Sequence, residues 1–268
     1  MAIIPDFYIN AVVSIGVRKK EEIKWIGTGF FVVKKVSENE YQPFMVTNRH
    51  VLKEKQAVVI RLREKDTNKL RIVDMPLFEN GKKLYSQHED ENIDIAVVLL
   101  NGGFITENNL DFAAFNIDEH ALNSKELIES GVDEGAIIYM LGFPMGLVNV
   151  NTNVPICRMG CIARMDEAEI KDTKNLLLDI QNFPGNSGSP IITRPEITSL
   201  DGTKALSRCV LLGIIHSYIP YEETLVNSQT GRTVEIRSEN SGIAKANPVE
   251  FIREVVEMEY KRQYFPES

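Results

Sequence analysis

Cysteine is scarce in this chain, with three residues among 268, and tryptophan occurs once. Three thiols cannot form a complete set of disulfides. Cys157 and Cys161 would also lie about 13 Å apart on one face of a strand, which is too far for a bridge. No histidine or further cysteine stands at a zinc-ligand spacing from them, so a structural zinc site is not expected. We therefore interpret these two thiols and Cys209 as reduced, and we expect a cytoplasmic protein.

Long hydrophobic runs and basic clusters are also missing. No stretch approaches the roughly 18 apolar residues that a membrane-spanning helix needs. Residues 1–7 lack the basic region, apolar core and cleavage site of a secretory signal. Lys and Arg number 30 against 38 Asp and Glu, a net charge of −8, and basic stretches such as Arg61–Lys65 alternate with other residues. From these absences we expect no membrane partner and no nucleic-acid partner. We also expect no metal and no cofactor.

Short apolar segments separated by Gly, Asn, Asp and Pro make up most of the chain. This pattern is typical of an all-β sandwich or barrel. A polar stretch at 101–134 divides the segments into two sets and is the best candidate for a linker. The segments are 11–17, 29–34, 57–63, 70–76 and 93–100 in the first set, and 136–142, 154–164, 176–180, 189–193 and 210–219 in the second.

The segment Gly185–Pro190, which reads Gly-Asn-Ser-Gly-Ser-Pro, is the most informative motif. Glycine adopts backbone angles that a Cβ forbids and lets the main chain approach a ligand closely. Such a turn can direct main-chain N–H groups at one point, as an oxyanion hole requires, beside a serine that can attack a carbonyl. Taken alone, the motif could equally be a glycine-rich hairpin turn.

Two further polar residues stand at the ends of apolar runs. His50 lies in the segment Thr47–Leu52, directly after an apolar strand, and Asp94 stands at the head of another. Each alone would be interpreted as a surface or turn residue. Together with Ser187 they give the order histidine, aspartate, serine that one group of serine peptidases uses. None of the other histidines and neighbouring acids combines this strand-edge context with flanking residues of this kind.

These blocks resemble those of chymotrypsin-fold serine peptidases, and most closely the bacterial HtrA-like branch of trypsin-like peptidases. Ser189 departs from the family, which usually has a second glycine there. The resemblance runs from about residue 10 to about residue 256. It is carried by Gly185–Pro190 and Thr47–Leu52, with support from Gly27–Phe31, Asp94–Val97, Leu141–Leu147 and Gly213–Ser217.

The resemblance implies two six-stranded antiparallel β-barrels followed by a C-terminal α-helix. We expect a single trypsin-like peptidase domain over 1–268, with barrels at about 8–102 and 135–246, a linker at about 103–134 and a helix at about 248–262. This leaves no room for a PDZ domain. The helix is also predicted from the residues themselves, because Asn247 and Pro248 fit an N-cap and a first helical position. Apolar residues follow at helical spacing: Phe251, Ile252, Val255 and Val256.

The resemblance further implies a serine endopeptidase that works through an acyl-enzyme. Ser187 would be the nucleophile, His50 its base and later the acid, and Asp94 the group that orients the imidazole. The oxyanion hole would be formed by Gly185, Asn186 and Ser187, with the N–H groups of Gly185 and Ser187 as donors. Digestive relatives have an aspartate at the position of Asn186, and it pairs with a newly cut N-terminus. An asparagine cannot form that ion pair, so we expect no maturation by cleavage.

Four residues are expected to bind substrate. Gln181, six residues before Ser187, would form a polar, uncharged pocket floor, which argues against a requirement for Arg or Lys. His216, Ser217 and Tyr218 belong to the segment that resembles the substrate-pairing strand. His216 could correspond to the pocket histidine of glutamyl endopeptidases, but it stands one position late, and in a strand that offset reverses the face. We therefore favour packing of His216 beside Asp94.

Three interpretations of the function stay open. A non-catalytic peptide-binding module would keep the fold, although such proteins usually lack a triad member and none is missing here. An esterase or a partner-activated effector peptidase would use the same triad, which the sequence cannot separate from a constitutive endopeptidase. The expected partners are a polypeptide substrate and a second protein or copy of the chain that controls activity. The segments 194–208 and 220–240 are expected to be loops or hairpins that rim the second barrel.

Overall fold

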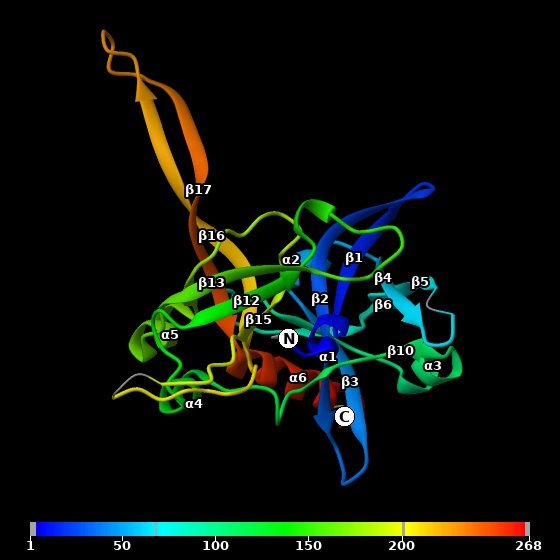
Figure 1. The fold of residues 1–268 in the computed structure, drawn as a ribbon. Helices are drawn as coiled ribbons and strands as arrows, with labels where there is room; N and C mark the ends of the chain where they lie inside the picture. The colour runs from blue at the N-terminus through cyan, green and yellow to red at the C-terminus, as the bar shows by residue number, and fades with distance from the viewer. Residues whose placement is uncertain (1–3, 68, 200–201, 266–268) are drawn as a thin grey trace.

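The computed structural model describes residues 4–67, 69–199 and 202–265. Two β-structures lie side by side, and the C-terminal helix packs against both (Figure 1). No helix in the described ranges is long and apolar enough to cross a membrane. The three cysteines form no disulfide, and burial raises the pKa of the Cys209 thiol to about 11.

The N-terminal half forms one nine-stranded sheet in the order β10-β4-β1-β2-β3-β9-β8, with β5 added on β4 and β11 on β2. We expected a closed six-stranded barrel here, whereas within the described residues β5 and β8 do not pair with each other. A mostly apolar cavity of about 340 Å³ lies at this opening, lined by residues of β4, β5, β9, α3 and α6. The strands are β1 (Val12–Lys19), β2 (Glu22–Lys35), β3 (Tyr41–Thr47), β4 (Ala57–Glu64), β5 (Leu70–Pro76), β8 (Tyr85–Gln87), β9 (Ala96–Leu99), β10 (Leu110–Asp111) and β11 (Phe115–Asn116), and a small separate hairpin pairs β6 (Phe78–Glu79) with β7 (Lys82–Lys83).

The C-terminal half is the closed six-stranded barrel that we predicted, in the order β12-β13-β14-β17-β16-β15. Each of its strands contributes at least one buried apolar side chain to its interior. The strands are β12 (Ile137–Gly142), β13 (Ile156–Arg164), β14 (Leu176–Asp179), β15 (Pro190–Thr193), β16 (Leu211–Val226) and β17 (Thr233–Pro248).

The helices are short except for the last one. The predicted C-terminal helix is present as α6 (Val249–Tyr264), and its apolar stripe is buried against the core. Pro248, not Asn247, occupies the N-cap position, because the Asn247 side chain is used inside the protein. The others are α1 (Asp6–Asn10), α2 (Arg49–Leu52), α3 (Gly102–Glu107), α4 (Ser124–Glu129), α5 (Glu167–Thr173) and the 3-10 turn η1 (Pro144–Gly146).

Part of the expected linker belongs to the N-terminal sheet. Leu110 and Phe115 are fully buried, and their short strands pair with β4 and β2. Residues 103–134 are polar on average, so the sequence pattern did not reveal that these two apolar residues are buried.

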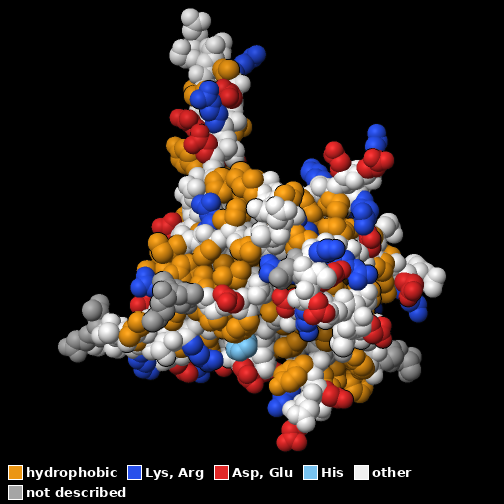
Figure 2. All heavy atoms as spheres, turned by 45° about the vertical axis from the view of Figure 1, so that its right-hand side comes forward, with side chains coloured by type: hydrophobic (Ala, Val, Ile, Leu, Met, Phe, Trp, Pro, Cys, Tyr) orange, Lys and Arg blue, Asp and Glu red, His pale blue; other side chains and the backbone are white. Residues whose placement is uncertain are grey.

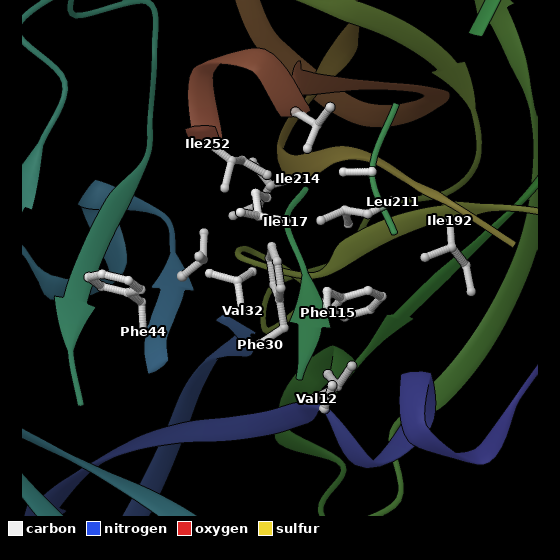
Figure 3. Packing of buried hydrophobic residues seen from close by; sticks show 14 of the residues in the cluster. Val12, Phe30, Val32, Phe44, Phe115, Ile117, Ile192, Leu211, Ile214 and Ile252 are labelled. Atoms are coloured by element: carbon white, nitrogen blue, oxygen red, sulfur yellow. The ribbon is translucent and has the colours of Figure 1, made fainter. Parts of the chain in front are cut away.

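One apolar cluster joins the two halves (Figure 3). Phe30, Val32 and Phe44 reach it from the sheet, Ile214 from the barrel and Ile252 from α6, and all five are fully buried. Because the cluster is continuous, the residues placed along the seam between the halves have a fixed relative position.

The largest departure from expectation is the length of β16 and β17. Each has 16 residues, and beyond the barrel they continue as a two-stranded hairpin that projects from the molecule (Figure 1). The segment 220–240, expected to rim the barrel, forms this projection, which we call the arm.

Candidate active site

His50 and Asp94 form a direct pair on the sheet side of the seam. His50 lies in α2, and Asp94 lies two residues before the start of β9. The Oδ1 atom of Asp94 accepts a hydrogen bond from the main-chain N–H of His50 at 3.0 Å, and its Oδ2 atom contacts Nδ1 of the ring. A carboxylate in this position holds the proton on Nδ1, which leaves Nε2 as an acceptor. The His50 side chain is 47% exposed and that of Asp94 is 16% exposed, so the open side of the ring faces solvent.

The backbone of Asp94 is held from both halves of the protein. The Asn48 side-chain amide donates to the Asp94 carbonyl at 2.7 Å, and the Asp94 N–H donates to Oδ1 of Asn247 at 2.9 Å. Asn247 is fully buried and donates in turn to the carbonyls of Asn92 (3.1 Å) and Lys174 (2.8 Å). This side chain at the end of β17 therefore fixes the acid of the pair. Sequence reasoning missed its role because the following proline suggested a helix cap.

Ser187 lies in the turn between β14 and β15, on the barrel side of the seam. Its carbonyl accepts a hydrogen bond from the Thr28 N–H of β2 at 2.9 Å. A Cβ built on Gly27 would lie 2.9 Å from the Val51 side chain and 3.3 Å from the Ser187 carbonyl oxygen. Gly27 therefore lies between the Ser187 turn and α2, the helix that carries His50. Among the described residues, however, no hydrogen bond joins the His50 ring to the Ser187 hydroxyl.

Both N–H groups that we expected as oxyanion donors are available. The N–H groups of Gly185 and Ser187 donate to no acceptor within the described part of the chain. The N–H of Asn186 donates to the Phe183 carbonyl at 3.0 Å, so its main chain is not available as a donor. Gly185 has a φ of +97°, and a Cβ there would lie 2.4 Å from the Phe143 carbonyl oxygen. Only glycine fits this turn.

Thr28 holds the carbonyl groups of this turn in place. Its Oγ1 atom donates to the Gly185 carbonyl at 2.7 Å and accepts from the Phe143 N–H at 3.1 Å. The Pro184 carbonyl is engaged separately by the Met145 N–H of η1, at 2.5 Å. Both carbonyls are thereby kept away from the N–H groups of Gly185 and Ser187. Nothing in the sequence block Gly27–Phe31 marks Thr28, because its partners are distant along the chain.

Replacing Thr28 with valine should therefore weaken the oxyanion hole while preserving the fold. We expect kcat to fall about 10- to 100-fold with little change in KM, because a misplaced N–H donor weakens binding of the transition state much more than binding of the substrate. Thr28→Ser keeps the hydroxyl and should retain most of the activity. Steady-state kinetics on both variants, normalised to folded protein, make the comparison. Equal losses in the two would show that packing of the methyl group matters and the hydrogen bonds do not.

A polar cleft of about 700 Å³ opens beside the His50–Asp94 pair. Of the four residues expected to bind substrate, His216 and Ser217 line it, whereas Gln181 and Tyr218 do not. Gln181 is exposed, and Tyr218 lies at the base of the arm. Asn175 and Lys245 also line the cleft and were not singled out in the sequence.

His216 is the second histidine of the cleft. Its Nε2–H donates to Oδ1 of Asn175 at 2.6 Å. Burial lowers its pKa to about 4; the negative charge of Asp94 opposes this shift, while His50 and Lys245 add to it. The ring is therefore neutral at pH 7, and a neutral ring that donates through Nε2 presents an unprotonated Nδ1.

The partly buried, neutral His216 should make the protein sensitive to mild acid. The unfolded chain takes up a proton near pH 6.5 and the folded chain only near pH 4, so stability is complete above pH 6.5 and falls through this window. Between pH 7.5 and pH 5 the loss attributable to this residue is about 2 kcal/mol. Urea unfolding at the two pH values should show it, and His216→Gln, which keeps a donor for Asn175, should reduce it. An unchanged pH dependence in that variant would assign the acid sensitivity to other groups.

Within the described residues, no group of three or more His, Cys, Asp or Glu side chains is arranged to hold a metal ion. The chemistry available at the seam is that of the serine hydroxyl, the imidazole–carboxylate pair and the two free main-chain donors.

Two of three comparisons with known proteins found a match. A family model described as the trypsin-like peptidase domain matches residues 27–196, which include His50, Asp94 and Ser187. No curated protein matches the sequence. A solved structure with a similar fold is the crystal structure of the MamO protease domain from Magnetospirillum magneticum in its apo form. The two align with a TM-score of 0.50 and 12% identity over 92% of this chain and 96% of that chain, which shows a shared fold.

Proposed function

The chain belongs to the trypsin-like peptidase family, and from that premise we propose that it is a serine endopeptidase that acts through an acyl-enzyme. The observation that carries the proposal is the His50–Asp94 pair, held beside a turn in which the N–H groups on either side of Asn186 have no acceptor among the described residues. A base and an oxyanion hole on opposite sides of one serine are the requirements of acyl transfer.

In the proposed mechanism, Nε2 of His50 removes the proton from the Ser187 hydroxyl as its oxygen attacks the peptide carbonyl. The N–H groups of Gly185 and Ser187 stabilise the oxyanion of the tetrahedral intermediate. The imidazolium, stabilised by Asp94, then protonates the leaving amine and the acyl-enzyme forms. Water activated by the same ring hydrolyses the ester and restores the serine. Because both donors are already unobstructed, we propose that the hole needs no activating cut.

Labelling with a fluorophosphonate tests the proposal directly, because the reagent phosphonylates only an activated serine. Wild-type protein should be labelled at Ser187, as located by peptide mass analysis, and Ser187→Ala should not react. His50→Ala should react at least about a hundredfold more slowly, since the base is lost. Ser189→Ala is the matched control: its hydroxyl is buried and without a partner among the described residues, so labelling should be unchanged. Folded wild-type protein that fails to react would contradict the proposal.

A further inference from the structure

The arm is a two-stranded hairpin with little to support it. Its strands pair from Pro220–Asn240 to Val226–Thr233, and it projects into solvent beyond the barrel (Figure 2). Isolated two-stranded hairpins are marginally stable in water. This one also exposes large apolar side chains, which indicates a surface that a partner covers: Tyr221 (58%), Leu225 (37%), Val226 (58%), Val234 (69%) and Ile236 (61%). The arm lies outside the residues that match the family model.

One edge of β16 leads from the Ser187 turn into the arm. β15 pairs with β16 only as far as Ile214. The next residue is attached to the turn, because Gly188 N–H donates to the Ile215 carbonyl at 3.1 Å and Ile215 N–H to the Ser189 carbonyl at 3.0 Å. From there to Val226, the only strand beside β16 in the described structure is β17. The opposite edge of β16 is therefore free, begins next to Ser187 and continues into the arm within a single strand.

We propose that the arm extends the substrate-binding edge, so that an extended polypeptide lies along β16 on the N-terminal side of the bond to be cut. This inference rests on the proposed endopeptidase function. An added strand pairs most favourably in the antiparallel sense. Because β16 runs outward from the Ser187 turn, an antiparallel peptide runs inward, and its residues upstream of the cut lie on the arm.

The geometry sets the length of substrate that reaches the arm. The eleven residues from His216 to Val226 span ten steps along the strand, or about 33 Å. A peptide with four residues upstream of the cut ends near Pro220. Pro220 has no N–H to donate, and the pairing of β16 with β17 shifts register just before it. A substrate therefore needs about five upstream residues to reach Tyr221 and about nine to reach Leu225.

The side chains of the arm indicate the chemistry of this substrate. Tyr221 and Leu225 are four residues apart on one face, and Val226 lies on the other, so apolar side chains on both faces of a peptide would be covered. The arm carries four Glu and two Arg within 220–240, a net charge of −2, which disfavours acidic peptides. The substrate class is an extended, unfolded, apolar polypeptide that lacks an acidic cluster.

A peptide-length series tests the proposal. A fluorogenic core peptide with four upstream residues is compared with versions extended by six alternating Val and Thr residues or by six Gly and Ser residues. For wild type, the Val/Thr extension should raise kcat/KM about tenfold through KM, and the Gly/Ser extension should have little effect. The double variant Tyr221→Ser/Leu225→Ser should lose this gain and cleave the core peptide as wild type does. Arg232→Ser, in the turn at the arm tip directly before β17, is the matched control and should behave as wild type.

Binding measured without turnover separates the two proposals. Fluorescein-labelled core and extended peptides are titrated into Ser187→Ala protein, with and without the two arm substitutions, and anisotropy is recorded. Tighter binding of the extended peptide only with an intact arm supports the inference. Cleavage of the core peptide with no effect of length on cleavage or binding overturns the inference and leaves the proposed function standing, whereas no cleavage of any peptide overturns both. Light scattering that shows a wild-type dimer and a monomeric double variant, again without a length effect, overturns the inference in favour of self-association.

Discussion

Gly188→Ala is expected to give a protein at least about 3 kcal/mol less stable than wild type and without measurable peptidase activity. Gly188 has a φ of +90°, and a Cβ there would lie 2.0 Å from the Thr28 carbonyl oxygen and 2.5 Å from Oγ1 of Thr47. Both atoms belong to β-strands that cannot withdraw, and Thr47 Oγ1 already donates to that same carbonyl at 2.7 Å. The turn must therefore move away from the sheet, which separates Ser187 from His50.

Urea unfolding and steady-state kinetics measure the two effects. Gly81→Ala is the matched control, because Gly81 has a similar φ of +78° and a Cβ there would meet nothing within 4 Å. The control should lose only about 1 kcal/mol from backbone strain and should keep its activity. If the two alanine variants were equally stable and equally active, the close approach of sheet and turn would have no part in forming the site.

Asp94→Asn is expected to lower kcat by about 10⁴-fold with the fold intact. The amide oxygen can still accept the His50 N–H, as Oδ1 of Asp94 does. At the other position, however, an NH₂ group cannot accept a proton from Nδ1 of the ring. The imidazole is then driven to the tautomer that carries its proton on Nε2, which cannot act as a base toward Ser187.

The control for this variant is Asp90→Asn. Asp90 is a neighbouring acid whose Oδ1 accepts the Asn92 N–H at 2.9 Å, a bond that an asparagine can keep. Kinetics normalised by active-site titration should show near-normal turnover for the control. A loss of less than tenfold in Asp94→Asn would mean that another group orients His50, and the assignment of Asp94 would be wrong.

The sequence was sufficient for the features that rest on local chemistry. The glycines around Ser187, the apolar strands of the barrel and the stripe of α6 each have a short-range signal, and the fold follows from them. Thr28 and Asn247 gave no such signal, because each acts through hydrogen bonds to residues more than 70 positions away. The type of a polar residue tells which hydrogen bonds it can form, but the folded structure determines which partner it finds.

The arm and the open sheet were missed for a different physical reason. Strand prediction relies on one face being buried, and both faces of the arm meet solvent. In β16 the residues from Tyr221 to Val226 therefore do not alternate between apolar and polar, although those of β17 from Thr233 to Arg237 do. Barrel closure depends on which edges pair, and neither the edge of β5 nor that of β8 has a local marker. The pairing of strands distant in sequence is the part of the fold that a single sequence specifies least.

Both halves of the protein share the apolar cluster shown in Figure 3. The integrity of the proposed active site is therefore coupled to the cooperative unfolding of the two halves. Since His50 and Asp94 come from one half and Ser187 from the other, neither half alone contains a competent centre. Loosening of either half exposes part of the common cluster and draws the triad apart in the same event, so partially melted species are catalytically silent. Under the proposed function, a partly unfolded copy would therefore have no peptidase activity.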